Sequence, residues 1–349
     1  MRGRGITYDT GFVGRAGNSR EHFDLTDVVA DLRAIRDRLH CTTVRITGGD
    51  PERIEMAANA AVDLGLEVWY SPYPLDLHPE EMLDMFADCA RRAERLRIAG
   101  HQVVFVAGAE LSLMNHGFLP GATMDERVHA VLSRPAGLGE LVAAASARLD
   151  DFLGRAVPLI RGHFGGRVTY ASIPFERVDW SRFDIVSVDL YRSAEIADRF
   201  ADGVRDLVAQ GKPVAITEFG CATYRGAADV GARGLEIVRY DPGTGRPVRL
   251  DGQYTRDEDG QAAAVREHLE VFDAAGVDTV FVFLFALEDM PSRPDGDPRD
   301  DLDLASYGIV RVLDRGSAAA GAGRRWEPKA AFHVVAEFYR PAPVGKVPA

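Results

Sequence analysis

The sequence lacks the features of several common protein classes. Its three cysteines, Cys41, Cys89 and Cys221, are far apart and form no CxxC pair, which excludes a cysteine-based zinc or redox motif. The segment Met1–Tyr8 has no apolar stretch typical of a signal peptide, and no apolar run reaches the roughly 20 residues that span a bilayer. We therefore expect a cytoplasmic protein with no membrane partner and with cysteines that are mainly small core residues.

Positive charge and cofactor motifs are also missing. The formal net charge is −12, which argues against nucleic acid as the main partner because phosphate binding needs clustered Lys and Arg. The chain contains no P-loop, no GxSxG elbow and no HExxH or HxH pair, so we expect no cofactor and no metal. With 349 residues, 46% of them hydrophobic, it is long enough for a large core.

Apolar runs of strand length alternate with segments of helical periodicity from one end of the chain to the other. This pattern predicts a single α/β domain over residues 1–340, a (β/α)₈ TIM barrel, with a short tail over 341–349. A doubly wound sheet is the alternative, but Gly14–Asn18 does not match its GxGxxG phosphate turn. The eight expected strands are Gly5–Tyr8, Thr43–Ile46, Leu66–Tyr70, Gln102–Ala109, Arg167–Ala171, Asp184–Tyr191, Pro213–Thr217 and Thr279–Ala286.

Three connections are longer than usual, and each follows a strand, on the barrel face where substrates bind. They follow strands 4, 7 and 8 and cover Leu111–Gly137, Phe219–Arg256 and Asp289–Ser306. The second contains a segment that predicts a hairpin turning at Asp241–Gly245. The third is acidic, and because it lacks the Gly and closing Glu of an EF-hand we expect a solvated loop rather than a calcium site.

Two glutamates end two of the apolar strands. Glu110 ends strand 4 and Glu218 ends strand 7, roughly opposite each other around the expected barrel mouth. A Glu beside a strand is most often a surface or ion-paired residue, but the joint pattern predicts an acid/base site. The apolar neighbours of Glu110 favour a raised carboxyl pKa, as a general acid requires, whereas Arg45 and Tyr191 are expected to keep Glu218 anionic.

Several short motifs resemble clan A, the large clan of retaining glycoside hydrolases. They are Thr217-Glu218-Phe219-Gly220, Arg45 late in strand 2, Tyr191 in strand 6, Tyr307-Gly308-Ile309-Val310 and the segment Trp326–Phe332. The resemblance implies a (β/α)₈ barrel that cleaves glycosides with retention, with Glu110 as acid/base, Glu218 as nucleophile and a small-molecule or oligosaccharide substrate. Over its whole length the chain also resembles actinobacterial proteins labelled "abortive infection protein", a label that assigns no chemistry.

The sequence departs from the clan pattern at two places. Ala109 stands where clan members usually have an Asn that bonds the sugar 2-hydroxyl, and strand 8 offers Phe285, Leu287 and Glu288 in place of a Trp platform. These departures favour the alternative hypothesis of a non-hydrolytic carbohydrate-binding barrel or pseudoenzyme. A metal-dependent site is a further alternative, with ligands from Glu110, Glu218, Asp189 and His116.

Other polar and aromatic residues follow the expected strands and are candidates for substrate binding. Each also has an ordinary structural interpretation, such as rim packing, a loop contact or an internal ion pair. The full set of substrate-binding candidates is Asp9, Arg45, Trp69, Tyr73, Asn115, His116, Asp189, Tyr191 and Glu288.

Overall fold

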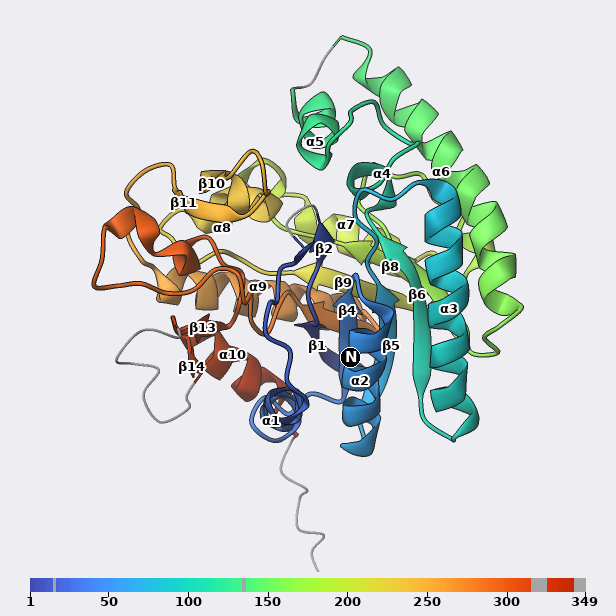
Figure 1. The fold of residues 1–349 in the computed structure, drawn as a ribbon, viewed down its shortest axis with the longest axis horizontal. Coiled ribbons are helices and arrows are strands. Elements are labelled where there is room, and N and C mark those ends of the chain that lie inside the picture. Colours follow the sequence, from blue (N-terminus) through green and yellow to red (C-terminus); the bar gives the residue numbers. More distant parts are fainter. Residues whose placement is uncertain (15–16, 134–135, 315–324, 342–349) are drawn as a thin grey trace, which may run out of the picture.

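A barrel of eight parallel strands forms the centre of the computed structural model, which describes residues 1–14, 17–133, 136–314 and 325–341 (Figure 1). Hydrogen-bonded neighbours run in the order β7-β6-β5-β4-β1-β12-β9-β8, and a parallel bridge between Ser172 and Val188 connects the two end strands, so the barrel is nearly closed. The expected (β/α)₈ fold is thus confirmed. The strands are β1 (Gly3–Asp9), β4 (Thr43–Gly48), β5 (Glu67–Pro72), β6 (Val103–Ala109), β7 (Arg167–Ala171), β8 (Val186–Asp189), β9 (Val214–Phe219) and β12 (Thr279–Val282).

Amphipathic helices connect the strands and cover the outside of the barrel. Local sequence determines their ends; for example, the Asp50 side chain accepts hydrogen bonds from the backbone amides of Glu52 and Arg53, with Pro51 at the first helical position. Gly276 ends its helix in the left-handed conformation at φ 81°. The covering helices are α1 (Leu25–Asp37), α2 (Pro51–Asp63), α3 (Pro79–Ile98), α6 (Leu138–Arg161), α7 (Phe200–Val208), α9 (Glu258–Ala275) and α10 (Ala330–Tyr339).

One strand differs from the sequence prediction. The last strand ends at Val282 rather than at Ala286, and Leu284 and Phe285, which follow it, are fully buried in two different apolar clusters. The apolar run therefore reflects burial and not extended backbone. Between β8 and β9, a short 3₁₀ turn, η2 (Ala194–Ile196), precedes α7, which begins at Phe200.

Side chains fill the barrel interior at the end opposite the mouth, near the amino-terminal ends of the strands. The rings of Trp69 and Phe281 pack edge to face with centroids 4.8 Å apart, and the indole N–H of Trp69 donates to Glu67 at 2.8 Å. Arg2 pairs with the other oxygen of Glu67 at 2.7 Å. The interior is therefore a packed core at this end, as is usual for such barrels, and the mouth lies at the carboxyl ends of the strands.

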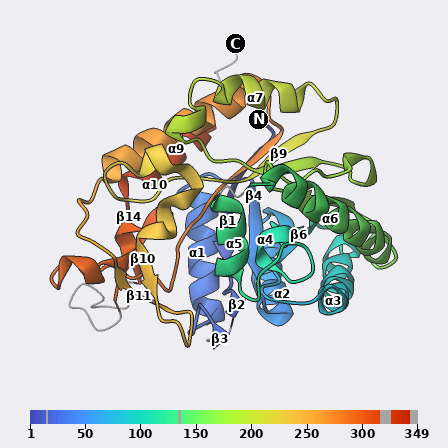
Figure 2. The ribbon, with the colours of Figure 1, turned by 90° about the horizontal axis from the view of Figure 1, so that it is seen from above.

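Extra elements lie at the mouth, in the three long connections (Figure 1). Seen from above, α5 and the β10–β11 hairpin occupy different sides of it (Figure 2). The hairpin expected at Asp241–Gly245 is present, since β10 and β11 pair antiparallel around that turn. These elements are α4 (Leu111–Met114), α5 (Met124–Leu132), α8 (Ala227–Val230), η3 (Gly231–Ile237), β10 (Val238–Tyr240), β11 (Pro247–Leu250), η4 (Pro298–Asp300) and η5 (Leu302–Leu304).

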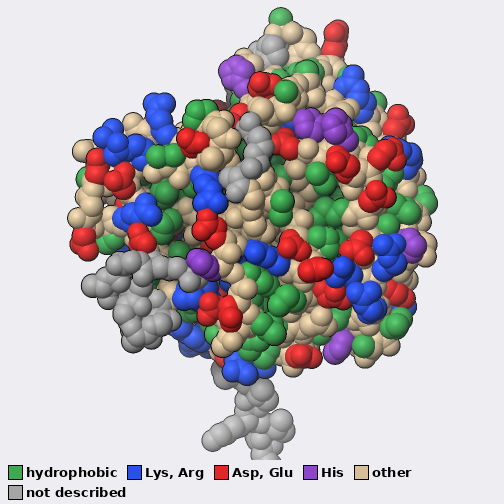
Figure 3. All heavy atoms as spheres, in the orientation of Figure 1, with side chains coloured by type: hydrophobic (Ala, Val, Ile, Leu, Met, Phe, Trp, Pro, Cys, Tyr) green, Lys and Arg blue, Asp and Glu red, His purple; other side chains and the backbone are tan. Residues whose placement is uncertain are grey.

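The remaining elements are small. Two further antiparallel pairs are β2 (Val13–Gly14) with β3 (Gly17–Asn18) and β13 (Val310–Val312) with β14 (Trp326–Pro328), and η1 (Trp180–Arg182) precedes β8. On the face shown in Figure 3, acidic and basic side chains are interspersed. None of the described helices has the length and apolarity that crossing a membrane requires. The tail expected at 341–349 lies, from 342 onward, outside the described residues.

Candidate active site

Glu218 lies where the pairing of β9 with its neighbours shifts. Val188 of β8 pairs with Ile216, but the next residue, Asp189, pairs with Glu218, so one residue of β9 is skipped. Shifts of this bulge type redirect side chains and are common beside active sites. The Glu218 side chain is 9% exposed and contacts Arg45 from the far side of the barrel, which places it at the interior of the mouth.

Arg45 and Tyr191 each bind one carboxyl oxygen of Glu218. The Arg45 guanidinium forms an ion pair with Oε1 at 2.8 Å, and the Tyr191 hydroxyl donates to Oε2 at 3.2 Å. Arg45 is itself fixed, since it also donates to Ser71 Oγ and to the Thr217 carbonyl, both at 3.1 Å. The guanidinium is fully buried, so its attraction for the Glu218 carboxylate is weakly screened by water.

Glu110 follows a second shift in strand pairing. The register of β6 against β7 changes between Val106 and Ala109, and Gly108 within this step has φ 84°, where a Cβ would meet Leu111 at 2.7 Å. Glu110 itself has the left-handed conformation, φ 47°, which is uncommon for a residue other than Gly and is often found at functional positions. The same turn starts the short helix α4.

A buried carboxyl supports the turn at Glu110. Glu176 accepts hydrogen bonds from the backbone amide and hydroxyl of Ser112 at 3.1 and 2.6 Å, and from the Tyr170 hydroxyl at 2.8 Å. Tyr170 in turn accepts from the Leu111 amide at 2.9 Å. No sequence pattern points to Glu176, because it lies in a loop without a motif.

The two glutamates have unequal surroundings. Burial raises the pKa of Glu110 well above its ordinary value, and the negative charges of Asp189 and Glu218 raise it further, against a smaller opposite effect of Arg45. Among the described residues, no cation forms an ion pair with Glu110, whereas Glu218 has Arg45 at 2.8 Å. A protonated Glu110 beside an ion-paired Glu218 is the arrangement that a general acid and a nucleophile require.

Aromatic rings line the mouth. Tyr73, which follows β5, packs edge to face with the half-buried Phe12 at 5.0 Å. Phe283 is half-buried just beyond β12 and contacts Tyr307, whose ring meets Tyr191 at 5.7 Å. Phe283 was not among the predicted site residues, because the apolar run Thr279–Ala286 predicts a strand that contains it, whereas β12 ends at Val282.

Other predicted residues lie apart from the two glutamates. Trp69 is fully buried in the packed interior described above. Asn115 is fully buried and braces the loop after β5, accepting from the Leu77 amide at 3.2 Å and donating to the Pro74 carbonyl at 3.1 Å. His116 stacks on His78 with ring centroids 4.6 Å apart. Within the part of the chain that the structure describes, these three residues form no hydrogen bond or ion pair with the Glu110 or Glu218 side chain.

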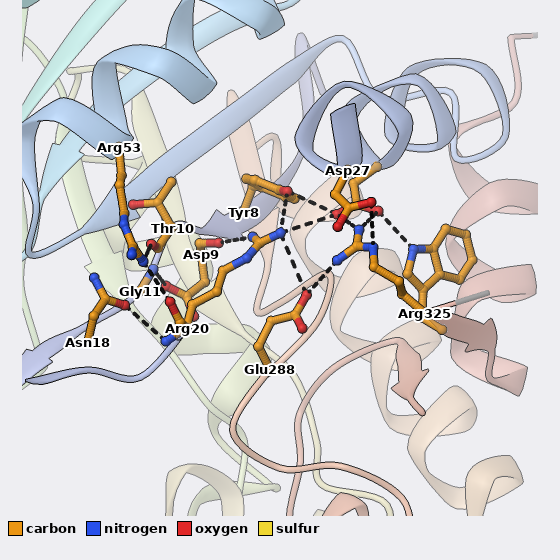
Figure 4. Close-up of polar contacts among 12 residues, drawn as sticks. Tyr8, Asp9, Thr10, Gly11, Asn18, Arg20, Asp27, Arg53, Glu288 and Arg325 are labelled. Carbon is orange, nitrogen blue, oxygen red and sulfur yellow. Dashed lines mark hydrogen bonds and ion pairs between the residues drawn. The ribbon is translucent and has the colours of Figure 1, made fainter. Parts of the chain in front are cut away.

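Asp9 and Glu288 belong to a different part of the rim, which Figure 4 shows. Asp9 Oδ1 accepts from the Gly11 amide at 2.5 Å, while Oδ2 is buried without a hydrogen-bond partner among the described residues. Burial is the main cause that raises the pKa of Asp9 to about 7. Glu288 is ion-paired with Arg20 at 3.6 Å and with Arg325 at 3.2 Å.

Glu288 is one member of a network that we call the Arg20 cluster. Asp31 is its centre, because it pairs with Arg325 at 2.6 Å and with Arg20 at 3.6 Å. The Tyr8 hydroxyl donates to Asp31 at 2.9 Å. The cluster, formed by Tyr8, Arg20, Asp31, Glu288 and Arg325, joins β1, α1 and the segment after β12 (Figure 4).

The acidic third loop differs from the expectation of a solvated loop. Asp303 is 1% exposed and pairs with Arg256 at 2.7 Å and with the fully buried Lys329 at 2.9 Å. Asp301 also pairs with Arg256, at 2.8 Å. Part of this loop is therefore fixed by buried ion pairs, and the described residues contain no group of three or more His, Cys, Asp or Glu that could hold a metal ion.

Several solved structures are similar to this chain in fold. A GH113 β-1,4-mannanase structure matches with a TM-score of 0.60 and 16% identity, covering 97% of this chain and 99% of the other. The GH113 β-mannanase of Alicyclobacillus acidocaldarius, in complex with ManMIm, matches with a TM-score of 0.53 and 17% identity, covering 97% of both chains. Cel5A of Thermotoga maritima, in complex with a mannotriose substrate, matches with a TM-score of 0.54 and 12% identity, covering 95% and 97%.

The other two comparisons gave no match. No family model matches the chain, and no curated protein matches it. The solved structures therefore show similarity in fold alone, and the comparisons lend no support to the resemblance to "abortive infection" proteins.

Proposed function

We propose that this protein is a retaining glycoside hydrolase in which Glu218 is the nucleophile and Glu110 is the acid/base. The observation that carries the proposal is the contrast between two carboxyls at one barrel mouth. Glu218 is ion-paired with Arg45 and bonded by Tyr191, whereas Glu110 has a raised pKa caused by burial and by neighbouring negative charge. Two carboxyls with opposite protonation are the requirement of this mechanism.

The reaction takes place in two steps. In the first, a Glu218 oxygen attacks the anomeric carbon while Glu110 gives its proton to the leaving oxygen, so that the glycosidic bond breaks and a glycosyl ester forms. In the second, Glu110 takes a proton from a water molecule, whose oxygen attacks the same carbon and releases the Glu218 carboxylate. Two inversions at one carbon give net retention.

Arg45 and Tyr191 position the nucleophile and respond to its change of charge. Both groups contact the carboxylate directly, at 2.8 and 3.2 Å. Their interaction weakens when the ester forms and strengthens again when the carboxylate is released, so they favour the second step. In this mechanism the acid Glu110 acts from the end of β6, where the backbone turns in the left-handed conformation.

The substrate class that fits best is a neutral oligosaccharide. The mouth offers the half-buried rings of Phe12 and Phe283, and Tyr240 on the β10–β11 hairpin is 41% exposed. Aromatic faces suit the apolar faces of sugar rings. Two of the similar solved structures are described as β-mannanases and a third as a complex with mannotriose, so β-linked mannose oligomers are the first substrates to test.

A second candidate function is non-hydrolytic binding of a carbohydrate. The observation that favours it is Ala109, which is fully buried and offers no hydrogen bond at a position next to the acid. Loss of a donor to the substrate 2-hydroxyl removes several kcal/mol of transition-state stabilisation. Turnover, and not binding, distinguishes the two functions.

The test is hydrolysis of β-linked mannose oligomers and of aryl glycosides by the full chain and two variants. Glu218→Gln should lower kcat by at least about 10⁴-fold on every substrate, because it removes the nucleophile. Glu110→Gln should lower kcat/KM by about 10²- to 10⁴-fold on substrates with a poor leaving group, and far less on dinitrophenyl glycosides, which need no proton. Product stereochemistry, read by proton NMR, should show retention.

Circular dichroism and ligand-binding calorimetry should show that both variants stay folded and still bind. Absence of turnover by the wild-type protein across the panel, together with measurable binding of mannose oligomers, would reject the hydrolase in favour of the binding protein. Equal activity of wild type and Glu218→Gln would reject the assigned nucleophile.

A further inference from the structure

The short helix α4 begins at Glu110 without a cap from its own N-cap residue. Glu110 occupies the N-cap position, and its side chain forms no capping hydrogen bond with the first turn. An N-cap side chain normally accepts from the second or third amide of its helix, because the first amides of a helix have no carbonyl partner within it. The acceptors for the first turn of α4 must therefore come from another part of the chain.

Every backbone amide from 110 to 115 has a hydrogen-bond partner. Four of these amides donate to backbone carbonyls, at 2.9 to 3.1 Å. The other two donate to side chains instead. The Leu111 amide donates to the Tyr170 hydroxyl at 2.9 Å. The Ser112 amide donates to Glu176 Oε1 at 3.1 Å, so the two amides directly after Glu110 depend on residues at and beyond the end of β7.

The Glu176 carboxyl organises both contacts. Its Oε2 accepts from the Tyr170 hydroxyl at 2.8 Å, which leaves the lone pairs of that hydroxyl to accept from the Leu111 amide. Its Oε1 accepts from the hydroxyl of Ser112 at 2.6 Å, in addition to the amide. Glu176 is only 7% exposed, so water gives these donors little alternative. One buried side chain thus serves the turn directly and through Tyr170.

Glu176 is itself held by the chain that follows β7. Its Oε2 also accepts from the Ser172 hydroxyl and from the Ile173 amide, both at 3.2 Å. The Glu176 amide donates to the Ile173 carbonyl at 3.0 Å. All five contacts of the carboxyl place a donor against it, so its role requires an acceptor at this place and no particular charge.

We propose that Glu176 is a positioning residue for Glu110. It supplies the cap of α4 that the N-cap residue would otherwise provide, and so leaves the Glu110 carboxyl available for proton transfer. Without this acceptor, buried amides directly after Glu110 lose their partners, which is costly, and the turn that carries the acid has to rearrange. The catalytic part of this role rests on the proposed function, whereas the capping part does not.

The kinetic test compares Glu176→Gln with the wild type on two kinds of aryl glycoside. Gln keeps the shape of the side chain but turns an NH₂ group toward one set of donors. On substrates with a poor leaving group, which need the proton of Glu110, kcat/KM should fall about 10²-fold. On dinitrophenyl glycosides, which need no proton, it should fall less than about 3-fold. A general loss of structure would lower both values equally.

Tyr170→Phe tests the same cap from a second position and serves if Glu176→Gln does not fold. It removes the hydroxyl between the Leu111 amide and Glu176, and should give the same selective loss, by about 10-fold. Azide should raise kcat of both variants on dinitrophenyl glycosides. It attacks the glycosyl ester without help from a base, which yields a glycosyl azide and the free Glu218 carboxylate.

Ser146→Ala is the matched control. The buried Ser146 hydroxyl accepts from the Arg177 amide at 3.2 Å, so the variant removes a bond to the same loop, one residue after Glu176, and leaves the cap of α4 in place. Its ratio of kcat/KM between the two kinds of substrate should be that of the wild type. The proposal would be overturned by an equal loss on both substrates in Glu176→Gln, or by the selective loss in Ser146→Ala.

Amide hydrogen exchange of the full chain, followed by NMR, gives a readout that needs no turnover. The Leu111 and Ser112 amides should exchange at least about 10-fold faster in Glu176→Gln than in the wild type, and at the wild-type rate in Ser146→Ala. Unchanged exchange in Glu176→Gln would show that Glu176 is not the cap. If no glycoside is turned over, the proposed function fails, but the exchange rates still decide the capping role.

Discussion

Two buried groups of charged side chains lie at the rim of this barrel, and they are organised differently. In the Arg20 cluster each carboxyl pairs with both arginines, at distances from 2.6 to 3.6 Å. In the group formed by Arg45, Glu218, Glu110 and Asp189, which we call the Arg45 cluster, only Glu218 has an ion pair. The first cluster fixes β1 against α1 and the segment after β12, whereas the second leaves two carboxyls without a counter-charge.

This difference indicates which cluster serves stability and which serves chemistry. Charges that are paired and hydrogen-bonded hold their protonation state over a wide pH range, which suits a structural contact. Carboxyls that are buried without a cation keep their protons to unusually high pH and can release them during a reaction. The two clusters therefore offer matched substitutions with opposite expected results.

The largest expected contrast is between Asp31→Asn and Asp189→Asn. Asp31→Asn leaves Arg20 and Arg325 buried with one acid fewer, so the free energy of unfolding should fall by about 3–5 kcal/mol. Asp189→Asn removes a carboxyl that has no ion pair within the described residues, so the change at neutral pH should stay within about 1 kcal/mol or be stabilising. Urea unfolding followed by circular dichroism measures both, and equal losses in the two variants would remove the distinction between the clusters.

Asp9 gives a second, pH-dependent contrast. It lies next to the Arg20 cluster, since its carbonyl accepts from Arg20 at 2.7 Å, yet its carboxyl is buried with one free oxygen, like those of the Arg45 cluster. Its pKa is raised from 3.8 to about 7 in the folded protein. A carboxyl whose pKa is raised by folding contributes stability that is present below pH 4. This contribution is lost as the pH rises toward 7, because over that range the carboxyl ionises only in the unfolded chain.

Asp9→Asn should therefore be more stable than the wild type above pH 7, by up to about 4 kcal/mol, and equal to it near pH 4. The Asn oxygen keeps the bond from the Gly11 amide. Thermal unfolding of both proteins between pH 4 and pH 8 measures the difference, and a gap that does not change with pH would show that Asp9 is charged in the fold.

The smallest expected effect is that of one hydroxyl group in each cluster. Tyr191→Phe removes the bond to Glu218 and should lower kcat about 10-fold, with little change in unfolding, because that bond acts on a charged group that changes during the reaction. Tyr8→Phe removes the bond to Asp31 in the Arg20 cluster and should lower stability without lowering kcat. Steady-state kinetics and thermal unfolding of both variants test the pair, and a loss of activity in Tyr8→Phe would contradict the separation of roles.

The sequence predicted the fold because the apolar strands are buried on both faces and several helices, such as α1, α2 and α9, carry their own N-caps. Strand length and the Asp50-Pro51 signal depend on neighbouring residues only, so they are visible in the chain. The placement of Glu110 and Glu218 at strand ends followed from the same pattern. The end of β12 was misjudged because Leu284 and Phe285 are buried by segments remote in sequence, which no local pattern records.

Remote partners also explain what the sequence could not predict at the site. Asp301 and Asp303 were expected in solvent, but Arg256 lies more than forty residues earlier and pairs with both. Glu176 gives no signal because it lies in a loop without a motif, and its partner Ser112 comes from the end of another strand. The register shift before Glu110 is visible in the sequence. Gly108 is an isolated glycine in a strand of larger residues, and such a glycine suggests a bulge.

The strand bulges have a practical consequence for engineering. Glu110 and Glu218 are positioned by the hydrogen-bonded strands of the barrel. By contrast, α5 and the β10–β11 hairpin at the entrance are separate insertions outside the strands. Replacing those two insertions with other segments would change the shape of the entrance, while the barrel strands would still position the two acids. The barrel is in this sense a fixed scaffold with two replaceable entrance segments.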